Sequence, residues 1–333
     1  MPRIYGAEVA GLGKCLPSKC LTNKDLEKII DTTDEWIQSR TGIKQRYVMG
    51  EGETLSDLCV VAAKQALDQA NLHVDDIDMI ICGTFTSDHK LPSLAALVQD
   101  KLGAKNTGAF DINAACTGFI YTLVTGAQFV RSGASKNVLV IGADCCSSQI
   151  DWEDRSTCVL FGDGASALVL RQHDDPNVGV QSSYFGSDGG GKESLWIEAG
   201  GSLMPVDEEV LKTKKHRVTM AGKDVFKFAI NALSTSAKEV LSQEGLDSSD
   251  IKLLVPHQAN SRIINAAAKR LDFSDEQIYL NIDKYGNTVA ASVGLALRDS
   301  YDEGKFKSGD KLLIIGFGAG LSWGGTVINW SID

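Results

Sequence analysis

The feature that most constrains this chain is an internal duplication. Residues 63–81 (AKQALDQANLHVDDIDMII) align with 237–255 (AKEVLSQEGLDSSDIKLLV) at an offset of 174, and seven of nineteen positions are identical. The same offset places NVLVIG (137–142) on KLLIIG (311–316), where the glycine is identical and every apolar position stays apolar. Two segments in one register indicate two related copies of one fold.

Each half alternates amphipathic helical patterns with short apolar strands such as MIIC (79–82) and LLVP (253–256). Continuous apolar strands are typical of sheets covered by helices on both faces. We therefore predict an α/β fold in which the halves pack as layers, sheet against helix against sheet. The halves are expected at 1–172 and 173–333, and the ligand site between them.

Two details accompany this division. An apparent hairpin at 157–171 (TCVLFGDGASALVLR) precedes the boundary, with GDG as its turn. Residues 184–222 depart from the first half and are rich in glycine and lysine. We expect this insert to be a mobile surface excursion that serves as a lid or a partner contact.

Composition narrows the class of protein. The chain has 333 residues, is 43% hydrophobic and has 33 glycines against 6 prolines, which is typical of an α/β enzyme. A net charge of −10 argues against nucleic-acid binding. No apolar run reaches the length of a membrane span and no signal-peptide pattern opens the chain, so the cytoplasm is the expected location. The eight cysteines form no CxxC pair or zinc-like spacing, so we expect reduced thiols and no metal.

Positive charge is nevertheless clustered. One stretch holds Lys212, Lys214, Lys215, Arg217, Lys223 and Lys227, and a later helical pattern holds Arg262, Lys269 and Arg270. On an acidic protein such a patch either attracts an anionic partner or is a solvated helix face.

Cys116 lies in FDINAACTGF, where a strand pattern ends and a helical pattern begins. A thiol at a helix start faces unpaired N–H groups and the positive end of the helix dipole, which favours a nucleophilic thiolate. By position alone, the alternative of one more buried cysteine is the more common case.

Two polar residues in the second half are candidates as its partners. His257 follows an apolar strand, at the strand end where α/β sheets expose functional groups, although a lone histidine is more often structural. Asn287 lies in the turn KYGNTVAAS, which mirrors the Cys116 turn or is an ordinary turn and helix cap. If a pseudo-dyad relates the two halves, the turns of Cys116, His257 and Asn287 converge at one interface.

The tail GFGAGLSWGG (316–325) allows close backbone approach and an amide aimed at a reacting oxygen, or is simply a glycine-rich connection between strands. It is not a GxGxxG turn opening a helix, so dinucleotide binding is unsupported.

Taken together, the motifs resemble the thiolase superfamily and, within it, the beta-ketoacyl-[acyl-carrier-protein] synthase III family. The resemblance spans the chain: DTTDEWIQSRTGI (31–43), AACTGF (114–119), VPHQAN (255–260), YGNT (285–288) and GFGAGLSWGG (316–325). It implies a five-layered αβαβα architecture, a homodimer and a decarboxylative Claisen condensation without metal or cofactor.

The resemblance also implies roles. Cys116 carries the acyl group taken from an acyl-CoA, and the backbone N–H groups of Cys116 and Ala319 form the oxyanion hole. His257 and Asn287 stabilise the enolate that forms when malonyl-[acyl-carrier-protein] loses carbon dioxide. CoA is held by Thr32, Trp36, Arg40, Arg155, Gly222 and Asn260, and the acidic carrier protein docks on Lys227, Arg262, Lys269 and Arg270.

Two positions depart from the family pattern. Ala319 stands where many relatives have glycine, which affects the room for the acyl chain. Leu91 stands where phenylalanine is common and, by resemblance, lines the acyl pocket across the dimer interface. The alternatives are a condensing enzyme of secondary metabolism, such as a quinolone or polyketide starter synthase, a cysteine acyltransferase or hydrolase with His257 as base, and a catalytically inactive binding scaffold.

Overall fold

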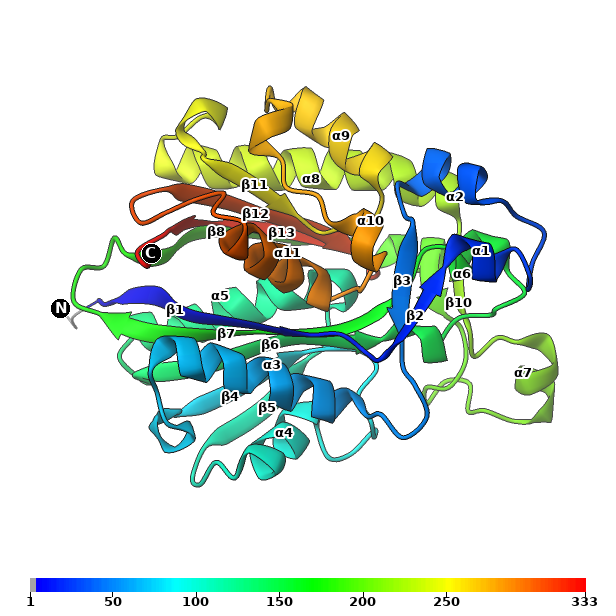
Figure 1. Cartoon of the computed structure of the whole chain (residues 1–333), viewed down its shortest axis with the longest axis horizontal. Helices are drawn as coiled ribbons and strands as arrows, with labels where there is room; N and C mark the ends of the chain where they lie inside the picture. Colours follow the sequence, from blue (N-terminus) through cyan, green and yellow to red (C-terminus); the bar gives the residue numbers. More distant parts are fainter. Residues whose placement is uncertain (1–3) are drawn as a thin grey trace.

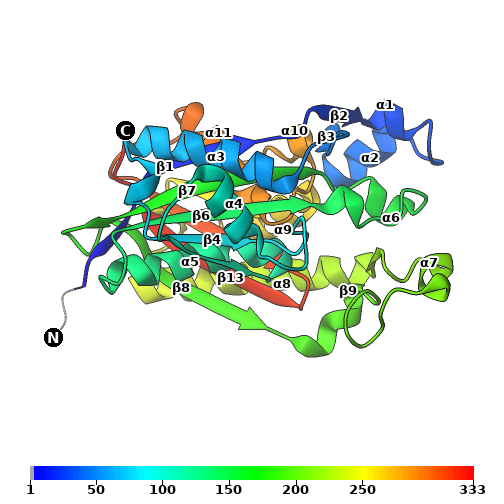
Figure 2. The same cartoon turned by 90° about the horizontal axis from the view of Figure 1, so that it is seen from below.

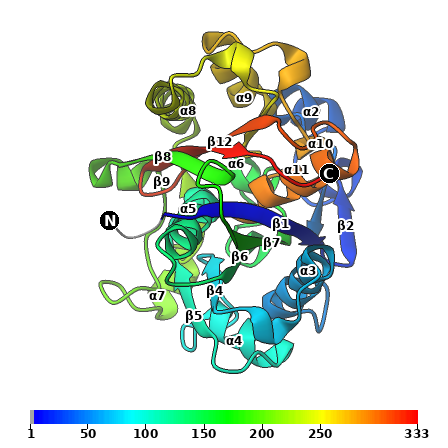
Figure 3. The same cartoon turned by 90° about the vertical axis from the view of Figure 1, so that its left-hand side faces the viewer.

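Five layers, helix–sheet–helix–sheet–helix, make up the computed structural model, which describes residues 4–333 (Figure 1, Figure 3). The expected packing of sheet against helix against sheet is therefore present. The outer layers pack α3 (Leu55–Ala70) and α4 (Leu94–Leu102) on one sheet and α8 (Gly222–Glu244) on the other, with α9 (Ser261–Arg270) packed against α8. The middle layer is α5 (Gly118–Arg131) and α11 (Ala291–Asp302), which contact both sheets.

The duplication seen in the sequence recurs in the strand order. Residues before 174 form the order β5-β4-β6-β7-β1, and later residues form β11-β12-β13-β8. In the first half β4 pairs with β6 in parallel, and β6–β7 and β7–β1 are antiparallel. The second half repeats this pattern: β11 pairs with β12 in parallel, and β12–β13 and β13–β8 are antiparallel. Ile278 forms an isolated parallel bridge to Leu254, where β5 pairs with β4 in the first half. The strands are β1 (Gly6–Cys15), β4 (Met79–Gly83), β5 (Gly108–Ile112), β6 (Asn137–Cys145), β7 (Asp163–His173), β8 (Gly179–Ser187), β11 (Leu253–Pro256), β12 (Lys311–Gly318) and β13 (Ser322–Asn329).

The single pair Ala7–Gly179 joins β1 to β8, so nine of the strands in residues 4–333 form one continuous order. The chain passes from β7 to β8 between residues 173 and 179. The division at 172/173 stays a prediction.

Shorter elements gather at one end of the layers (Figure 1, Figure 2). They are β2 (Lys19–Thr22), α1 (Asn23–Leu26), α2 (Asp34–Thr41), β3 (Gln45–Val48), α6 (Arg155–Cys158), β9 (Leu195–Ile197), α7 (Glu208–Thr213), β10 (Val218–Met220) and α10 (Ile282–Tyr285). No helix within residues 4–333 is both long and apolar enough to cross a membrane.

One detail of the sequence prediction is wrong. Residues 157–171 are not a hairpin, because α6 and a turn precede β7, which pairs with β6 and β1. The expected role of the insert at 184–222 as a lid or a partner contact stays a prediction. Its strands β9 and β10 pair with each other, and Val218 donates a backbone hydrogen bond to Gln149 in the first half.

The middle helices meet at their N-termini through small residues. A Cβ added to Gly118 would lie 3.3 Å from Cβ of Ala290, the residue that caps α11. On the neighbouring strand β6, a Cβ at Gly142 would lie 2.5 Å from the carbonyl oxygen of Ala290 and 2.7 Å from Cδ2 of Phe119. Larger side chains at these positions would force the two halves apart.

The same place carries matched backbone strain. Ala115 has φ 45°, and Val289, at the duplication offset of 174, has φ 51°. Left-handed backbone costs an L-residue about 1–2 kcal/mol, so it persists only where surrounding packing enforces it. In both halves this turn directs the chain abruptly into the middle helix.

Replacing Gly142 by alanine should destabilise the protein by about 1–3 kcal/mol, because the added methyl meets backbone that cannot move aside cheaply. The free energy of unfolding in urea measures the effect. Gly201, whose added Cβ would touch nothing within 4 Å, provides the matched control. Equal stability of Gly142→Ala and Gly201→Ala would contradict this account of the helix contact.

Candidate active site

Cys116 lies in a 3-10 turn (Ala115–Thr117) between β5 and α5, and only 6% of it is exposed. The left-handed Ala115 makes the turn sharp, and the hydroxyl of Thr117 donates to the carbonyl of Ala114 (2.7 Å). The thiol is thereby held at the start of the middle helix, where it borders a cavity.

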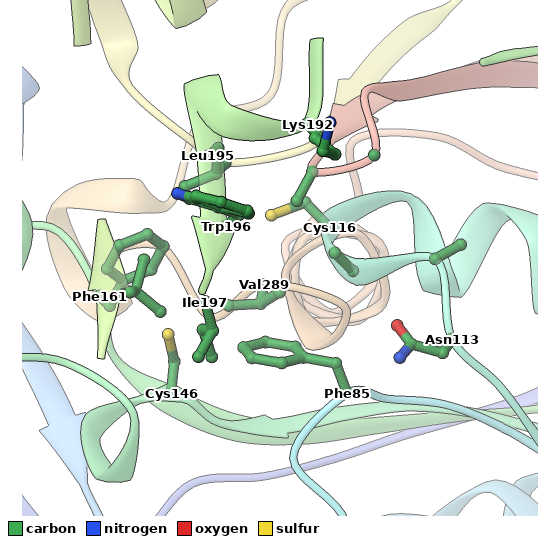
Figure 4. Close-up of a pocket in the computed structure, with 15 residues that line it drawn as sticks. Phe85, Asn113, Cys116, Cys146, Phe161, Lys192, Leu195, Trp196, Ile197 and Val289 are labelled. Carbon is green, nitrogen blue, oxygen red and sulfur yellow. The ribbon is translucent and has the colours of Figure 1, made fainter. Parts of the chain in front are cut away.

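The cavity has a volume of about 450 Å³ and a mainly apolar lining. Figure 4 shows Cys116 on one side and Phe85 and Cys146 on the other. One wall comes from the insert, which contributes Lys192, Leu195, Trp196, Ile197 and Val218; the remaining lining residues are Asn113, Ala114, Ala115, Phe161, Val289, Ala319 and Gly320. A mainly apolar cavity bordered by a thiol suits an acyl chain attached to sulfur.

The Cys116 thiol is not the thiolate expected from its place at a helix start. Burial raises its pKa to about 12, and the carboxylate of Asp144 acts in the same direction. Desolvation is the largest cause, because the charged sulfur would have little water around it, and it outweighs the opposing backbone N–H of Cys116. The thiol is protonated near neutral pH, so its proton must leave when the sulfur attacks.

His257 follows β11 and is completely buried. Its backbone N–H donates to Ile315 (2.8 Å), its ring packs edge-on against Phe317, and its Nδ1 lies 2.6 Å from Oγ of Ser292. Burial lowers the pKa of His257 to about 3, so the ring is neutral near pH 7. Its Nε2 has no hydrogen-bond partner among residues 4–333.

Strand β12 passes between this histidine and the Cys116 turn. A Cβ added to Gly316 would lie 3.4 Å from Cβ of His257 and 3.9 Å from Cγ2 of Thr117. Two residues on, a Cβ at Gly318 would lie 2.9 Å from the backbone nitrogen of Cys116. Glycine at both positions lets the elements from the two halves approach one backbone closely.

Asn287 reaches the same region from the turn before α11. Its backbone pairs with Leu160 and Gly162, beside the cavity residue Phe161. Its Oδ1 accepts from the N–H of Val289 (2.9 Å), which also lines the cavity. This bond fixes the amide, and its Nδ2 makes no hydrogen bond with the described residues.

The loop at Ala319 is tied to the Cys116 turn. The hydroxyls of Thr117 and Ser322 lie 2.8 Å apart in a buried contact, and Oγ of Ser322 is 3.0 Å from the Ala319 carbonyl. Ala319 and Cys116 thus border one cavity from different halves of the chain.

The residues expected to hold CoA fall into small groups. The guanidinium of Arg155 lies 4.7 Å from the centre of the Trp36 ring and donates to the carbonyl of Asp31 (2.8 Å). Asn260 caps α9 and donates to the carbonyl of Arg40 (3.1 Å). Thr32 has a buried hydroxyl without a partner among residues 4–333, and Gly222 is exposed at the start of α8.

The clustered basic residues fall into two groups, one paired with acidic residues and one unpaired among residues 4–333. Lys214 pairs with Asp151 and Glu153, and Lys215 pairs with Glu198, so much of that charge is neutralised. By contrast, Lys227, Arg262, Lys269 and Arg270 are exposed on the packed helices α8 and α9, and none forms an ion pair with residues 4–333. Arg262 stacks over Phe226, and Arg270 donates to Asn231.

Leu91 is 88% exposed and does not border the cavity of its own chain. Its expected role across a dimer interface stays a prediction.

Sequence reasoning missed two buried residues of the site. Asp144, which ends the apolar run NVLVIGAD, accepts hydrogen bonds from Thr84, Phe85, Thr86 and the Ala290 N–H. A carboxylate at the end of a buried strand was the signal that the sequence offered. Only the duplication pointed to Ser292 in the sequence, because at the offset of 174 Ser292 aligns with Gly118.

Among residues 4–333, no group of three or more His, Cys, Asp or Glu side chains is placed to hold a metal ion.

Comparison with known proteins agrees with this geometry. The profile of the 3-oxoacyl-[acyl-carrier-protein] synthase III family matches residues 110–189, and the profile of its C-terminal part matches residues 241–330. A curated beta-ketoacyl-[acyl-carrier-protein] synthase III from Caldanaerobacter subterraneus is 50% identical over 98% of this chain and 98% of its own.

Solved structures agree as well. The 3-oxoacyl-[acyl-carrier-protein] synthase III of Aquifex aeolicus superposes with a TM-score of 0.90 at 44% identity, covering 98% of this chain and all of that one. The priming beta-ketosynthase of the R1128 polyketide pathway gives 0.92 at 35% identity, covering all of this chain and 98% of that one.

Fold and site therefore define a condensing acyltransferase of the thiolase fold, as the sequence predicted. Within that class, the chain belongs to the beta-ketoacyl-[acyl-carrier-protein] synthase III family.

Proposed function

We propose that the protein takes an acyl group from an acyl-CoA onto Cys116 and condenses it with malonyl-[acyl-carrier-protein], which initiates fatty acid synthesis in the cytoplasm. The observation that carries this proposal is the composition of the site. An apolar cavity ends at a buried thiol, and the other half supplies Nε2 of His257, which is buried without a hydrogen-bond partner among residues 4–333, and the side-chain amide of Asn287.

In the first step the sulfur of Cys116 attacks the thioester carbonyl of the acyl-CoA. The backbone N–H groups of Cys116 and Ala319 are proposed to hold the oxygen that becomes negative. The bond between the carbonyl carbon and the CoA sulfur breaks, CoA leaves, and the proton lost by Cys116 ends on the sulfur of CoA. The acyl chain then occupies the cavity between Cys116 and the Phe85–Cys146 side.

In the second step malonyl-[acyl-carrier-protein] replaces CoA. His257 and Asn287 donate to its thioester oxygen, and these bonds strengthen as carbon dioxide leaves and an enolate forms. The carbanion attacks the acyl thioester, the bond between the acyl carbon and the sulfur of Cys116 breaks, and a beta-ketoacyl carrier protein results. The released thiolate of Cys116 takes up a proton from solvent, which restores the thiol. No proton-abstracting base is needed, because decarboxylation supplies the carbanion.

Two surfaces are proposed to bring the substrates in. Trp36 and Arg155, already stacked, would hold the adenine of CoA, with Thr32, Arg40, Gly222 and Asn260 around the rest of the molecule. The unpaired cations Lys227, Arg262, Lys269 and Arg270 would dock the acidic carrier protein. Leu91 would line the partner's acyl pocket in a homodimer.

The priming ketosynthase of a polyketide pathway supports a second candidate, the same condensation with a different primer for a secondary metabolite. Turnover with acetyl, longer straight, branched and aromatic acyl-CoAs separates the two. A hydrolase or a simple acyltransferase does not account for Asn287 beside the cavity.

The intact mass of the protein after acyl-CoA addition should rise by one acyl group in the wild type and in His257→Ala, and should not rise in Cys116→Ser. His257→Ala should then fail to decarboxylate malonyl-[acyl-carrier-protein], with a loss of about 100- to 1000-fold, because one oxyanion donor is gone. An adduct that persists in Cys116→Ser would remove Cys116 as the nucleophile.

Reversing the charge of Lys227 or Arg262 to glutamate should lower kcat/KM for malonyl-[acyl-carrier-protein], most strongly at low salt, and leave acylation by acyl-CoA unchanged. Lys238→Glu, at an exposed position farther along α8, is the matched control. If the three variants behave alike in steady-state kinetics at several salt concentrations, the docking surface lies elsewhere.

A further inference from the structure

His257 has one hydrogen-bonded ring nitrogen and one free ring nitrogen. Its Nδ1 lies 2.6 Å from Oγ of Ser292, and both side chains are at most 1% exposed. Its Nε2 is buried without a partner among residues 4–333. Since the ring is neutral, it carries one proton, and the nitrogen that holds it decides whether Nε2 is a donor or an acceptor.

The hydrogen bonds of Ser292 settle this question. Besides Nδ1, its oxygen contacts only the backbone N–H of Gln258 (3.4 Å), which can only donate. The hydroxyl hydrogen therefore has no acceptor among residues 4–333 other than Nδ1. The reverse arrangement, with Nδ1–H donating to Oγ, would leave this buried hydroxyl hydrogen unbonded.

Comparison of the halves shows that this contact is specific to the second one. At the duplication offset, His257 and Ser292 correspond to Gly83 and Gly118. A Cβ at Gly83 would lie 2.7 Å from the backbone carbonyl group of Gly118, so the strand end and helix start touch without side chains. The second half places a hydrogen-bonded pair at the same crossing.

We propose that Ser292 is a positioning residue, whose hydroxyl donates to Nδ1 of His257 and keeps the ring proton on Nε2. The histidine then presents an N–H to the reacting thioester oxygen. This inference rests on the proposed role of His257 as donor to the enolate oxygen. Without Ser292 the proton can move to Nδ1, and a bare Nε2 would repel that oxygen.

The test combines NMR with kinetics on the full chain. Labelling histidine rings with ¹⁵N and recording long-range ¹H–¹⁵N correlations shows which nitrogen is protonated, and His257→Gln identifies the signals of His257. We expect Nε2–H in the wild type. In Ser292→Ala we expect protonated Nδ1 to appear, decarboxylation of malonyl-[acyl-carrier-protein] to fall about 10- to 100-fold in kcat with KM nearly unchanged, and acylation of Cys116 to persist.

Ser300→Ala is the matched control, because Ser300 is buried on the same helix and its hydroxyl donates to the carbonyl of Ala296. A wild-type ring protonated on Nδ1 would overturn the proposal whether or not the variants fold. So would a Ser292→Ala protein with unchanged ring signals and the rate of Ser300→Ala. Full decarboxylation by His257→Ala, which leaves no side-chain donor at this position, would instead overturn the role of His257 itself.

Discussion

The contact between the N-termini of the two middle helices is the constraint on which the rest depends. Gly118 of α5 meets Ala290 at the start of α11, and Gly142 of β6 leaves room for the Ala290 carbonyl. The buried carboxylate of Asp144 adds a hydrogen bond from the Ala290 N–H and others from the loop after β4. A left-handed residue lies three residues before the start of α5 and two before the start of α11, so this contact brings the turns that carry function to one place.

The candidate active site lies around that contact, where the two halves of the chain carry different residues. The first half contributes a thiol and glycines, and the second contributes His257, Ser292 and the Asn287 turn. Burial keeps both reactive groups uncharged, since it raises the pKa of Cys116 and lowers that of His257. A neutral donor and a neutral thiol suit chemistry in which negative charge appears on oxygen only as bonds change.

Much of this was predictable, because the duplication alone implies stacked sheets and helices, and the motifs around Cys116, His257 and Asn287 indicate the family. The features that the sequence did not predict depend on burial and on contacts between residues far apart in the chain. The helix start predicts a thiolate, but desolvation prevails at Cys116. The lysine stretch looks uniformly basic, yet Lys214 and Lys215 meet acids that are distant in the sequence. The insert looks detached, yet Trp196 and Ile197 line the cavity, as no local pattern could show.

The central claim is that one cavity between the halves holds an acyl group on Cys116. A crystal structure of the wild-type protein soaked with an acyl-CoA, without malonyl-[acyl-carrier-protein], tests it most directly. We expect a thioester on Cys116, its carbonyl oxygen at the backbone nitrogens of Cys116 and Ala319, and its chain between Phe85 and Ile197. An acyl group on another cysteine, or a chain directed away from this cavity, would contradict the account.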